Sequence, residues 1–237
     1  MEVGCYTSAR ATHGRVWHAA LHAQRLARDA RLLGLGEIDP AEVLRMLAEL
    51  AAPTRAGGDA KLRIEARREA GRLRLVGACQ PLDPDPPAWR AVSAPCRHAG
   101  ASPTSRAKTT ARARYEEALE AARRAGVDEA LLFDATGFLV EGGRTNLLVE
   151  RSDGALVTPP LARGAQAGVA RQVLLERVPA LCEADVAAAE LASAREILAT
   201  NAVRGVRPIV VLDGRAVGHG CPGRWAEQLA RAFQLDC

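Results

Sequence analysis

Residues 127–149 read VDEALLFDATGFLVEGGRTNLLV, and this stretch decides most about the fold. Its apolar runs are short, and turn-forming residues such as Gly137 separate them. Short apolar runs bounded by turns are typical of buried strands. An Asp153-Gly154 turn follows and predicts a further hairpin. The strands predicted from these runs are 130–134, 138–140, 147–149 and 155–157.

Helical patterns flank this predicted sheet. The charged segment 109–125 is predicted to be a long helix that ends at Gly126, a residue that suits a helix C-terminus. Residues 170–178 and the alanine-rich residues 187–199 are also predicted to be helical. Further strands are predicted at 89–95 and 209–212.

A proline-rich stretch, PLDPDPP at 81–87, divides the chain. Proline density excludes a helix or a central strand, so the chain must cross here in extended form. We therefore predict a small α+β domain at 1–84 and a larger domain at 85–237. In the small domain, the predicted elements are strands 5–11, 16–20, 61–65 and 72–78 and helices 22–33 and 41–51, the last with Asp39 as its N-cap and Pro40 at the first helical position.

The composition is that of a globular protein. The chain has 237 residues, 48% of them hydrophobic and 25% charged, and its net charge is only +4 with arginines spread along the sequence. This argues against a nucleic-acid binder but suits an anionic cofactor or a carboxylate substrate. The spacing of the six cysteines indicates neither a metal site nor a disulfide framework. Without a signal-peptide pattern or an apolar run of bilayer length, the expected compartment is the cytoplasm.

Lysine is rare in this sequence. Of 32 basic residues, only Lys61 and Lys108 are lysine and the other 30 are arginine. A guanidinium stays protonated and cannot form an imine, whereas a lysine amine can be made nucleophilic. The two lysines are therefore candidates for amine chemistry, and the alternative is that both are ordinary surface residues.

From Lys108 to Arg171, the motifs resemble those of the class IV aminotransferases, which use pyridoxal 5'-phosphate and have fold type IV. Lys108 stands about one helix before the 127–134 strand, as the family's Schiff-base lysine does. Then follow, in the family's order, Glu141 in GFLVE, Asn146 in NLLV, TPP at 158–160 and GVAR at 168–171. The resemblance implies a two-domain α+β fold, with a small α/β N-terminal domain and a larger cofactor-binding domain that has a barrel-like sheet and carries the lysine.

An aldehyde cofactor needs an uncharged amine, a carboxylate against its ring nitrogen and donors around its phosphate. By the resemblance, Lys108 supplies the amine and Glu141 pairs with the ring nitrogen. Arg25, in the family pattern His-x-x-Arg-Leu, would clamp the phosphate as a charged fork. The remaining cofactor-binding residues that the resemblance implies are Asn146, the helix start Gly168-Val169, and Thr200-Asn201-Ala202 in the family's second phosphate turn.

The chain departs from the family pattern at three places. Leu148 stands where the family usually has an aromatic residue, and Gln166 replaces a common aliphatic residue. Neither change removes a catalytic group. The sequence also begins almost at the first substrate-site strand, where the family usually has a preceding hairpin. This leaves three interpretations: a trimmed start, a compact variant or an altered enclosure of the substrate.

The beginning of the sequence favours one branch of the family. Residues 4–10, GCYTSAR, resemble the opening of aminodeoxychorismate lyase, and Lys108 followed by Arg112 fits its Lys-x-x-x-Arg pattern. That enzyme converts 4-amino-4-deoxychorismate to 4-aminobenzoate and pyruvate on the folate route. The branched-chain aminotransferases tend to have a tyrosine five residues after the lysine, where this chain has Ala113.

The resemblance to the lyase implies that Lys108 removes the proton from the amine-bearing carbon. Thr7, or Ser8 beside it, would give a proton to the leaving enolpyruvate, while Arg10 and Arg144 would meet the substrate carboxylates. The alternative is an aminotransferase for branched-chain or D-amino acids, which shares the steps up to the carbanion. The second alternative is an inactive family member that serves as an interaction protein. A homodimer is expected by analogy, and neither nucleic acid nor a membrane is an expected partner.

Overall fold

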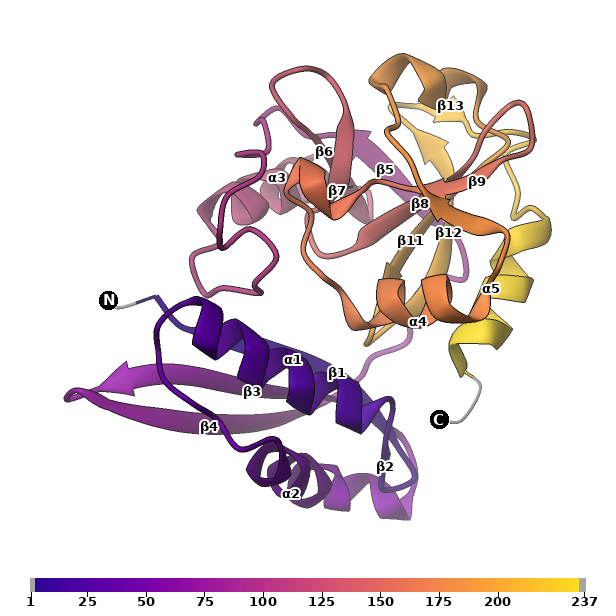
Figure 1. Ribbon diagram of the computed structural model, residues 1–237. Coiled ribbons are helices and arrows are strands. Elements are labelled where there is room, and N and C mark those ends of the chain that lie inside the picture. Colours follow the sequence, from indigo (N-terminus) through magenta and orange to yellow (C-terminus); the bar gives the residue numbers. More distant parts are fainter. Residues whose placement is uncertain (1–2, 235–237) are drawn as a thin grey trace. The chain divides into compact units, whose positions relative to one another are not determined.

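The computed structural model describes residues 3–234. These residues divide into two compact units (Figure 1), one formed by residues 3–85, Arg106–Ala111 and Gln234 and the other by Pro86–Ser105 and Arg112–Phe233. The sequence-based division at residue 84 assigned Lys108 to the larger domain, whereas its segment groups with the first unit. The reason is backbone pairing, since Tyr6 N donates to Lys108 O over 2.9 Å.

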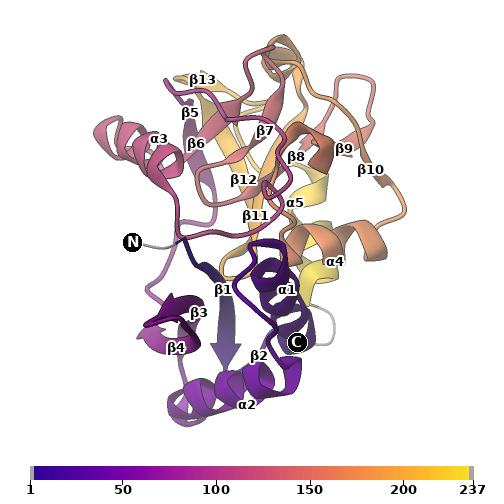
Figure 2. The same cartoon turned by 60° about the vertical axis from the view of Figure 1, so that its left-hand side comes forward.

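The first unit is a four-stranded antiparallel sheet with two helices on one side (Figures 1 and 2). The strand order is β2-β1-β3-β4. Alternate residues of β1 face the helices and form the core of this unit together with apolar residues of both helices. The elements are β1 (Cys5–Thr12), β2 (Arg15–Val16), α1 (Ala19–Leu32), α2 (Pro40–Ala51), the 3₁₀ helix η1 (Ala52–Ala56), β3 (Asp59–Glu69) and β4 (Arg72–Pro81).

Local signals predicted part of this unit well. Asp39 caps α2 by accepting a hydrogen bond from Ala41 N over 2.9 Å, and Pro40 occupies the first turn, as predicted. The predicted strand 16–20 is wrong beyond Val16. His18 adopts a left-handed conformation and the chain enters α1 at the next residue, so the second strand of the hairpin is very short.

The second unit is built on a nine-stranded mixed sheet in the order β10-β9-β8-β11-β12-β5-β6-β7, with β13 paired to β12. Its strands are β5 (Trp89–Ser93), β6 (Glu129–Phe133), β7 (Leu139–Gly142), β8 (Asn146–Glu150), β9 (Leu156–Thr158), β10 (Leu181–Glu183), β11 (Glu196–Asn201), β12 (Gly205–Leu212) and β13 (Arg215–Ala216). Its helices are α3 (Ala113–Arg124), α4 (Val169–Arg177) and α5 (Arg224–Gln234), with the 3₁₀ turns η2 (Leu161–Arg163) and η3 (Ala188–Ser193).

The centre of this sheet explains both a success and an error of the sequence analysis. Every residue of β6 and β8 is buried, as the apolar runs predicted. The predicted helix at 187–199 is wrong, because η3 ends at Ser193 and β11 follows. This strand pairs with β8 on one side and β12 on the other, so tertiary pairing overrides the helix propensity of the alanines.

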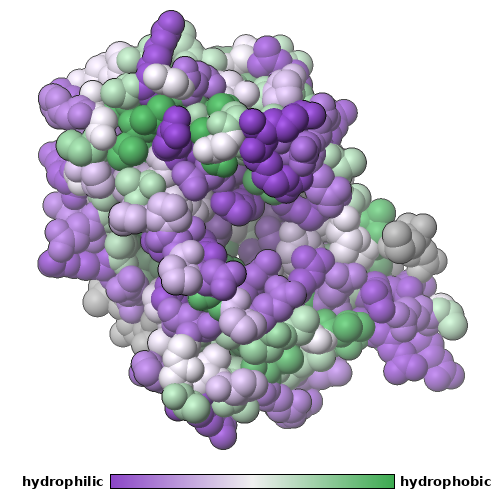
Figure 3. All heavy atoms as spheres, turned by 180° about the vertical axis from the view of Figure 1, so that it is seen from behind, coloured by the Kyte–Doolittle hydropathy of each residue, from purple (hydrophilic) through white to green (hydrophobic). Residues whose placement is uncertain are grey.

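The surface carries few large apolar side chains. Figure 3 shows a face on which hydrophilic residues dominate. Among residues 3–234, the exposed large hydrophobic side chains are Val3, Leu32, Leu44 and Val76. In the same range, no helix combines the length and the apolar character needed to cross a membrane.

Candidate active site

Lys108 is held through its backbone in the first unit. Its N–H donates to Asp29 Oδ2 over 3.0 Å, and its carbonyl accepts from Tyr6 N. The Nζ atom lies 5.0 Å from the centre of the Tyr6 ring. Asp29 is fully buried and also accepts from Arg28 over 2.8 Å. Asp29 therefore anchors the candidate catalytic lysine to α1, a role that no sequence pattern indicated.

Arg25 lies one helical turn before Asp29 and is a buried cation. Its Nη2 donates to Thr7 Oγ1 over 2.7 Å, but its buried Nε has no hydrogen-bond partner within residues 3–234. Burial lowers the pKa of Arg25 to about 10, although the Asp29 charge opposes this effect. A buried guanidinium with an unused donor is costly unless an anion joins it. The arrangement therefore fits the phosphate clamp predicted from the sequence.

Thr7 and Ser8 point to opposite faces of β1. Thr7 is fully buried, and its hydroxyl contacts both Arg25 and His22 Nδ1, the latter at 2.7 Å. Ser8 is half-buried and shares its strand face with Tyr6, because side chains alternate along a strand. Ser8 therefore lies on the strand face of Tyr6, whose ring centre is 5.0 Å from Lys108 Nζ. Which of the two hydroxyls donates a proton stays a prediction.

The two arginines predicted to bind substrate carboxylates each have protein partners. Arg10 forms an ion pair with Asp59, and its Cζ lies 4.6 Å from the centre of the Trp17 ring. Arg144 Nη2 donates to Asp128 O over 2.6 Å. Their role toward substrate stays a prediction, because binding a carboxylate would compete with these contacts.

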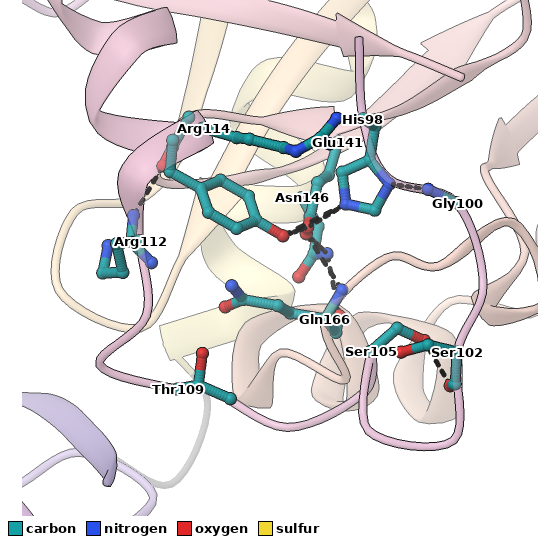
Figure 4. Close-up of polar contacts among 12 residues, drawn as sticks. His98, Gly100, Ser102, Ser105, Thr109, Arg112, Arg114, Glu141, Asn146 and Gln166 are labelled. Atoms are coloured by element: carbon teal, nitrogen blue, oxygen red, sulfur yellow. Dashed lines mark hydrogen bonds and ion pairs between the residues drawn. The ribbon is translucent and has the colours of Figure 1, made fainter. Parts of the chain in front are cut away.

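In the second unit, Glu141 and Asn146 belong to one hydrogen-bond network (Figure 4). Glu141 Oε2 accepts from Gln166 N over 3.0 Å and from Asn146 Nδ2 over 3.3 Å. Asn146 Nδ2 also donates to Gln166 O over 3.0 Å. The Glu141 side chain is only 3% exposed. The contact with Gln166 uses its backbone, so the departure in side-chain type at this position leaves the carboxylate support intact.

Gly168 begins α4 beside this network. Its φ of −72° is open to any residue, so the need for glycine is steric. A Cβ at this position would lie 2.1 Å from Asn146 Oδ1. The helix has no side-chain cap, so its first N–H groups, which begin at Val169, are suited to an anion.

The last two residues of β11, Thr200 and Asn201, include a second unused donor. Asn201 Oδ1 accepts from Val203 N over 3.0 Å and from Arg204 N over 2.8 Å, so this side chain shapes the turn. Ala202 follows it and is buried. Thr200 is 1% exposed, and its hydroxyl has no hydrogen-bond partner among residues 3–234. Thr200 is therefore a better candidate than the Asn201 side chain for donating to a phosphate.

Two further residues on the Glu141 network were missed. The hydroxyl of Tyr115, in α3, donates to Glu141 Oε1 over 2.6 Å. His98 Nε2 lies 3.1 Å from the same hydroxyl. The sequence offered only a weak signal, namely that Tyr115 is one of two tyrosines in the chain.

In the first unit, the unused donor of Arg25 suits a phosphate. In the second unit, the unused donor of Thr200, the uncapped start of α4 and the supported carboxylate of Glu141 suit a phosphorylated cofactor with a ring nitrogen. The model of the amino-transferase class IV family matches residues 4–212. A curated relative, provisionally named a branched-chain-amino-acid aminotransferase of Methanocaldococcus jannaschii, is 31% identical over 114 residues. That match spans 46% of this chain but only 39% of the relative's length.

Solved structures are similar over nearly the whole chain. A Legionella pneumophila protein, provisionally named a 4-amino-4-deoxychorismate lyase, has a TM-score of 0.86 at 20% identity and covers 99% of this chain and 91% of its own. A hypothetical aminotransferase from Mycobacterium tuberculosis in its PLP-bound form has a TM-score of 0.81 at 22% identity, with coverages of 97% and 87%. These similarities show the two-domain α+β fold. With the family match over most of its length, the chain belongs to the class IV aminotransferase family, whose cofactor is pyridoxal 5'-phosphate.

Proposed function

We propose that the chain is a pyridoxal-phosphate enzyme with the activity of aminodeoxychorismate lyase. The observation that carries the cofactor assignment is the buried Glu141 carboxylate, which hydrogen-bond donors hold in place from both oxygens. The lyase assignment rests on the GCYTSAR opening and on Lys108 followed by Arg112. The likeness to the Legionella protein agrees with it but concerns the fold alone.

Each candidate residue has a separate role in the proposed reaction. When bound, pyridoxal phosphate supplies a ring that withdraws electrons from the carbon bearing the substrate amine. Glu141 would keep the ring nitrogen protonated, and Arg25 with the α4 start would hold the phosphate. The Lys108 amine would take the proton from the substrate carbon and hold it on Nζ. Ser8, on the Tyr6 face of β1, would protonate the departing enolpyruvate.

An aminotransferase for branched-chain or D-amino acids is the second candidate, because the curated relative from Methanocaldococcus carries a branched-chain name. The two reactions differ in their co-reactants. The lyase breaks the bond to the enolpyruvyl oxygen and needs no second substrate, whereas a transaminase needs a keto-acid acceptor. The branched-chain aminotransferases tend to have a tyrosine five residues after the lysine. This chain has Ala113 there, which favours the lyase.

The test uses purified holoenzyme and 4-amino-4-deoxychorismate without a keto acid. We expect equal amounts of 4-aminobenzoate and pyruvate. Lys108→Arg should abolish turnover, while the matched control Lys61→Arg should retain it, because only Lys108 is assigned an amine role. Conversion of a branched-chain or D-amino acid to its keto acid only when a keto-acid acceptor is present, with no 4-aminobenzoate formed, would favour the transaminase. Protein that takes up no cofactor would instead favour an interaction protein.

The proposal includes a cytoplasmic homodimer. Light scattering of the purified protein should give twice the chain mass of 25.1 kDa. A mass of one chain with full lyase turnover would remove the dimer from the proposal without affecting the reaction.

A further inference from the structure

Three elements of the second unit converge on one oxygen of Glu141. This residue lies in β7, Tyr115 lies in α3, and His98 lies in the loop after β5. Glu141 Oε1 is 2.6 Å from the Tyr115 hydroxyl and 3.6 Å from His98 Nε2. Figure 4 shows His98 and Glu141 side by side. The His98 residue is 8% exposed, so the group is largely withdrawn from solvent.

The hydrogen-bond chain has a defined direction. Gly100 N donates to His98 Nδ1 over 3.0 Å, so the neutral ring carries its proton on Nε2. This Nε2–H can then donate to the Tyr115 oxygen at 3.1 Å. The tyrosine proton is directed to Glu141, because a charged carboxylate can only accept. The chain therefore runs from His98 through Tyr115 to Glu141.

The surroundings keep Tyr115 in the donating form. Burial, and next the Glu141 charge, raise the pKa of the Tyr115 hydroxyl. The Cζ atom of Arg112 lies 4.7 Å from the centre of the tyrosine ring, and Arg112 Nη2 donates to Gly143 O over 2.7 Å. Hydrogen bonds to a carboxylate favour its charged form, and successive bonds in a chain polarise one another. The chain from His98 thus stabilises the Glu141 carboxylate, so that it would face a protonated ring nitrogen without taking its proton.

We propose that Tyr115 and His98 are positioning residues that set how strongly Glu141 holds the proton on the cofactor's ring nitrogen. This inference rests on the proposed function, because it requires Glu141 to be the partner of that nitrogen. Asn146 Nδ2 and Gln166 N donate to the other oxygen, Oε2. Tyr115 and His98 act at Oε1.

The variants separate the hydrogen bond from the packing. Tyr115→Phe removes only the hydroxyl. In His98→Gln, the side-chain amide can place a donor near the Nε2 position, whereas in His98→Asn the amide oxygen can keep the contact with Gly100 N but the reach to Tyr115 is lost. Circular dichroism and the melting temperature of each apoenzyme establish that the variants are folded.

The readout is the protonation of the cofactor rather than turnover. Holoenzyme loaded with pyridoxal phosphate labelled with ¹⁵N in the ring should give the shift of a protonated nitrogen. Tyr115→Phe and His98→Asn should move this shift toward the unprotonated value, whereas His98→Gln should keep the wild-type shift. The dissociation constant for pyridoxal phosphate should rise roughly fivefold in Tyr115→Phe. Binding of 1-deazapyridoxal phosphate, which lacks the ring nitrogen, should be unchanged.

The outcomes distinguish a failure of this inference from a failure of the Glu141 assignment. A shift that moves in Glu141→Gln but not in Tyr115→Phe or His98→Asn overturns this inference and leaves the cofactor assignment standing. A shift unchanged in Glu141→Gln overturns the assignment of Glu141 and this inference with it. Equal weakening of both cofactors by Tyr115→Phe would show a merely structural role and would also overturn it.

Discussion

The hydroxyl oxygen of Thr7 lies 2.7 Å from Nδ1 of His22, and neither residue is exposed to solvent. Arg25 donates to the same oxygen over 2.7 Å. The Thr7 hydroxyl therefore contacts both His22 and the buried guanidinium of Arg25, and it accepts a hydrogen bond from the guanidinium. This relationship separates Thr7 from Ser8, the adjacent residue on the other face of β1.

The first prediction concerns this pair. Thr7→Val should raise the dissociation constant for pyridoxal phosphate by roughly tenfold, because Arg25 loses an acceptor that orients it. Its kcat at saturating cofactor should stay near the wild-type value. Ser8→Ala should bind the cofactor normally but lower kcat by about 10²-fold, the usual minimum for a lost proton donor. Lyase kinetics at saturating cofactor check both, and the reverse pattern would make Thr7 the donor.

The second prediction concerns acid stability. Burial, and next the Arg25 charge, lower the pKa of His22 well below its usual value. Below about pH 6.5 the unfolded chain therefore binds a proton at this residue that the folded protein does not. Because the unfolded state binds more protons, the free energy of unfolding should fall with decreasing pH, by up to about 1.4 kcal/mol per pH unit from this residue.

Urea unfolding of the apoenzyme between pH 7.5 and pH 5 measures this dependence. His22→Asn is the comparison, because asparagine keeps an acceptor for Thr7 but has no titrating ring. The variant should be less stable at pH 7.5 and should show a flatter pH dependence. Identical slopes in the two proteins would exclude His22 as the source.

How far the sequence predicts this protein depends on how local each signal is. The start of α2 was predictable because Asp39 and Pro40 act within one helical turn. The strand β11 was not, because residues 187–199 are rich in alanine and only pairing with β8 and β12 makes the second half extended. Local propensity was correct in the first case and was overridden in the second.

The same distinction applies to the candidate site. Glu141 and Asn146 are five positions apart, and the sequence motif contains both. The link between Lys108 and Asp29 joins residues 79 positions apart, and no local pattern indicates it. Tyr115 and Glu141 are 26 positions apart. The motifs therefore predict candidate residues, whereas the contacts that orient those residues are visible only in the fold.

The third prediction concerns Arg25. Arg25→Lys keeps a positive charge but loses the planar guanidinium. In Arg25 that group contacts Thr7 through Nη2, and its Nε is not used in any hydrogen bond among the described residues. The dissociation constant for pyridoxal phosphate should rise about 10- to 100-fold, the equivalent of roughly 1.5–3 kcal/mol for a hydrogen bond to a charged group. Arg31→Lys, on the same helix but exposed and paired with Glu37, should bind normally. Calorimetric titration of the apoenzymes checks both, and equal affinities would remove Arg25 from the phosphate site.

The fourth prediction concerns the packing of Gly168 against Asn146. Because an added Cβ would lie 2.1 Å from Asn146 Oδ1, Gly168→Ala must displace this amide and weaken its bond to Glu141. Overpacking of this kind costs about 1–3 kcal/mol of stability, and the loss of carboxylate support should weaken cofactor binding.

A double-mutant cycle with Asn146→Ala tests that cause. Once the asparagine side chain is removed, the clash disappears, so adding Gly168→Ala should cost little further stability. Gly168→Ala should therefore lower the free energy of unfolding more in the wild-type protein than in the Asn146→Ala variant. Chemical unfolding of the four apoenzymes measures the coupling. Fully additive effects would mean that the stability cost of Gly168→Ala has a cause other than contact with Asn146.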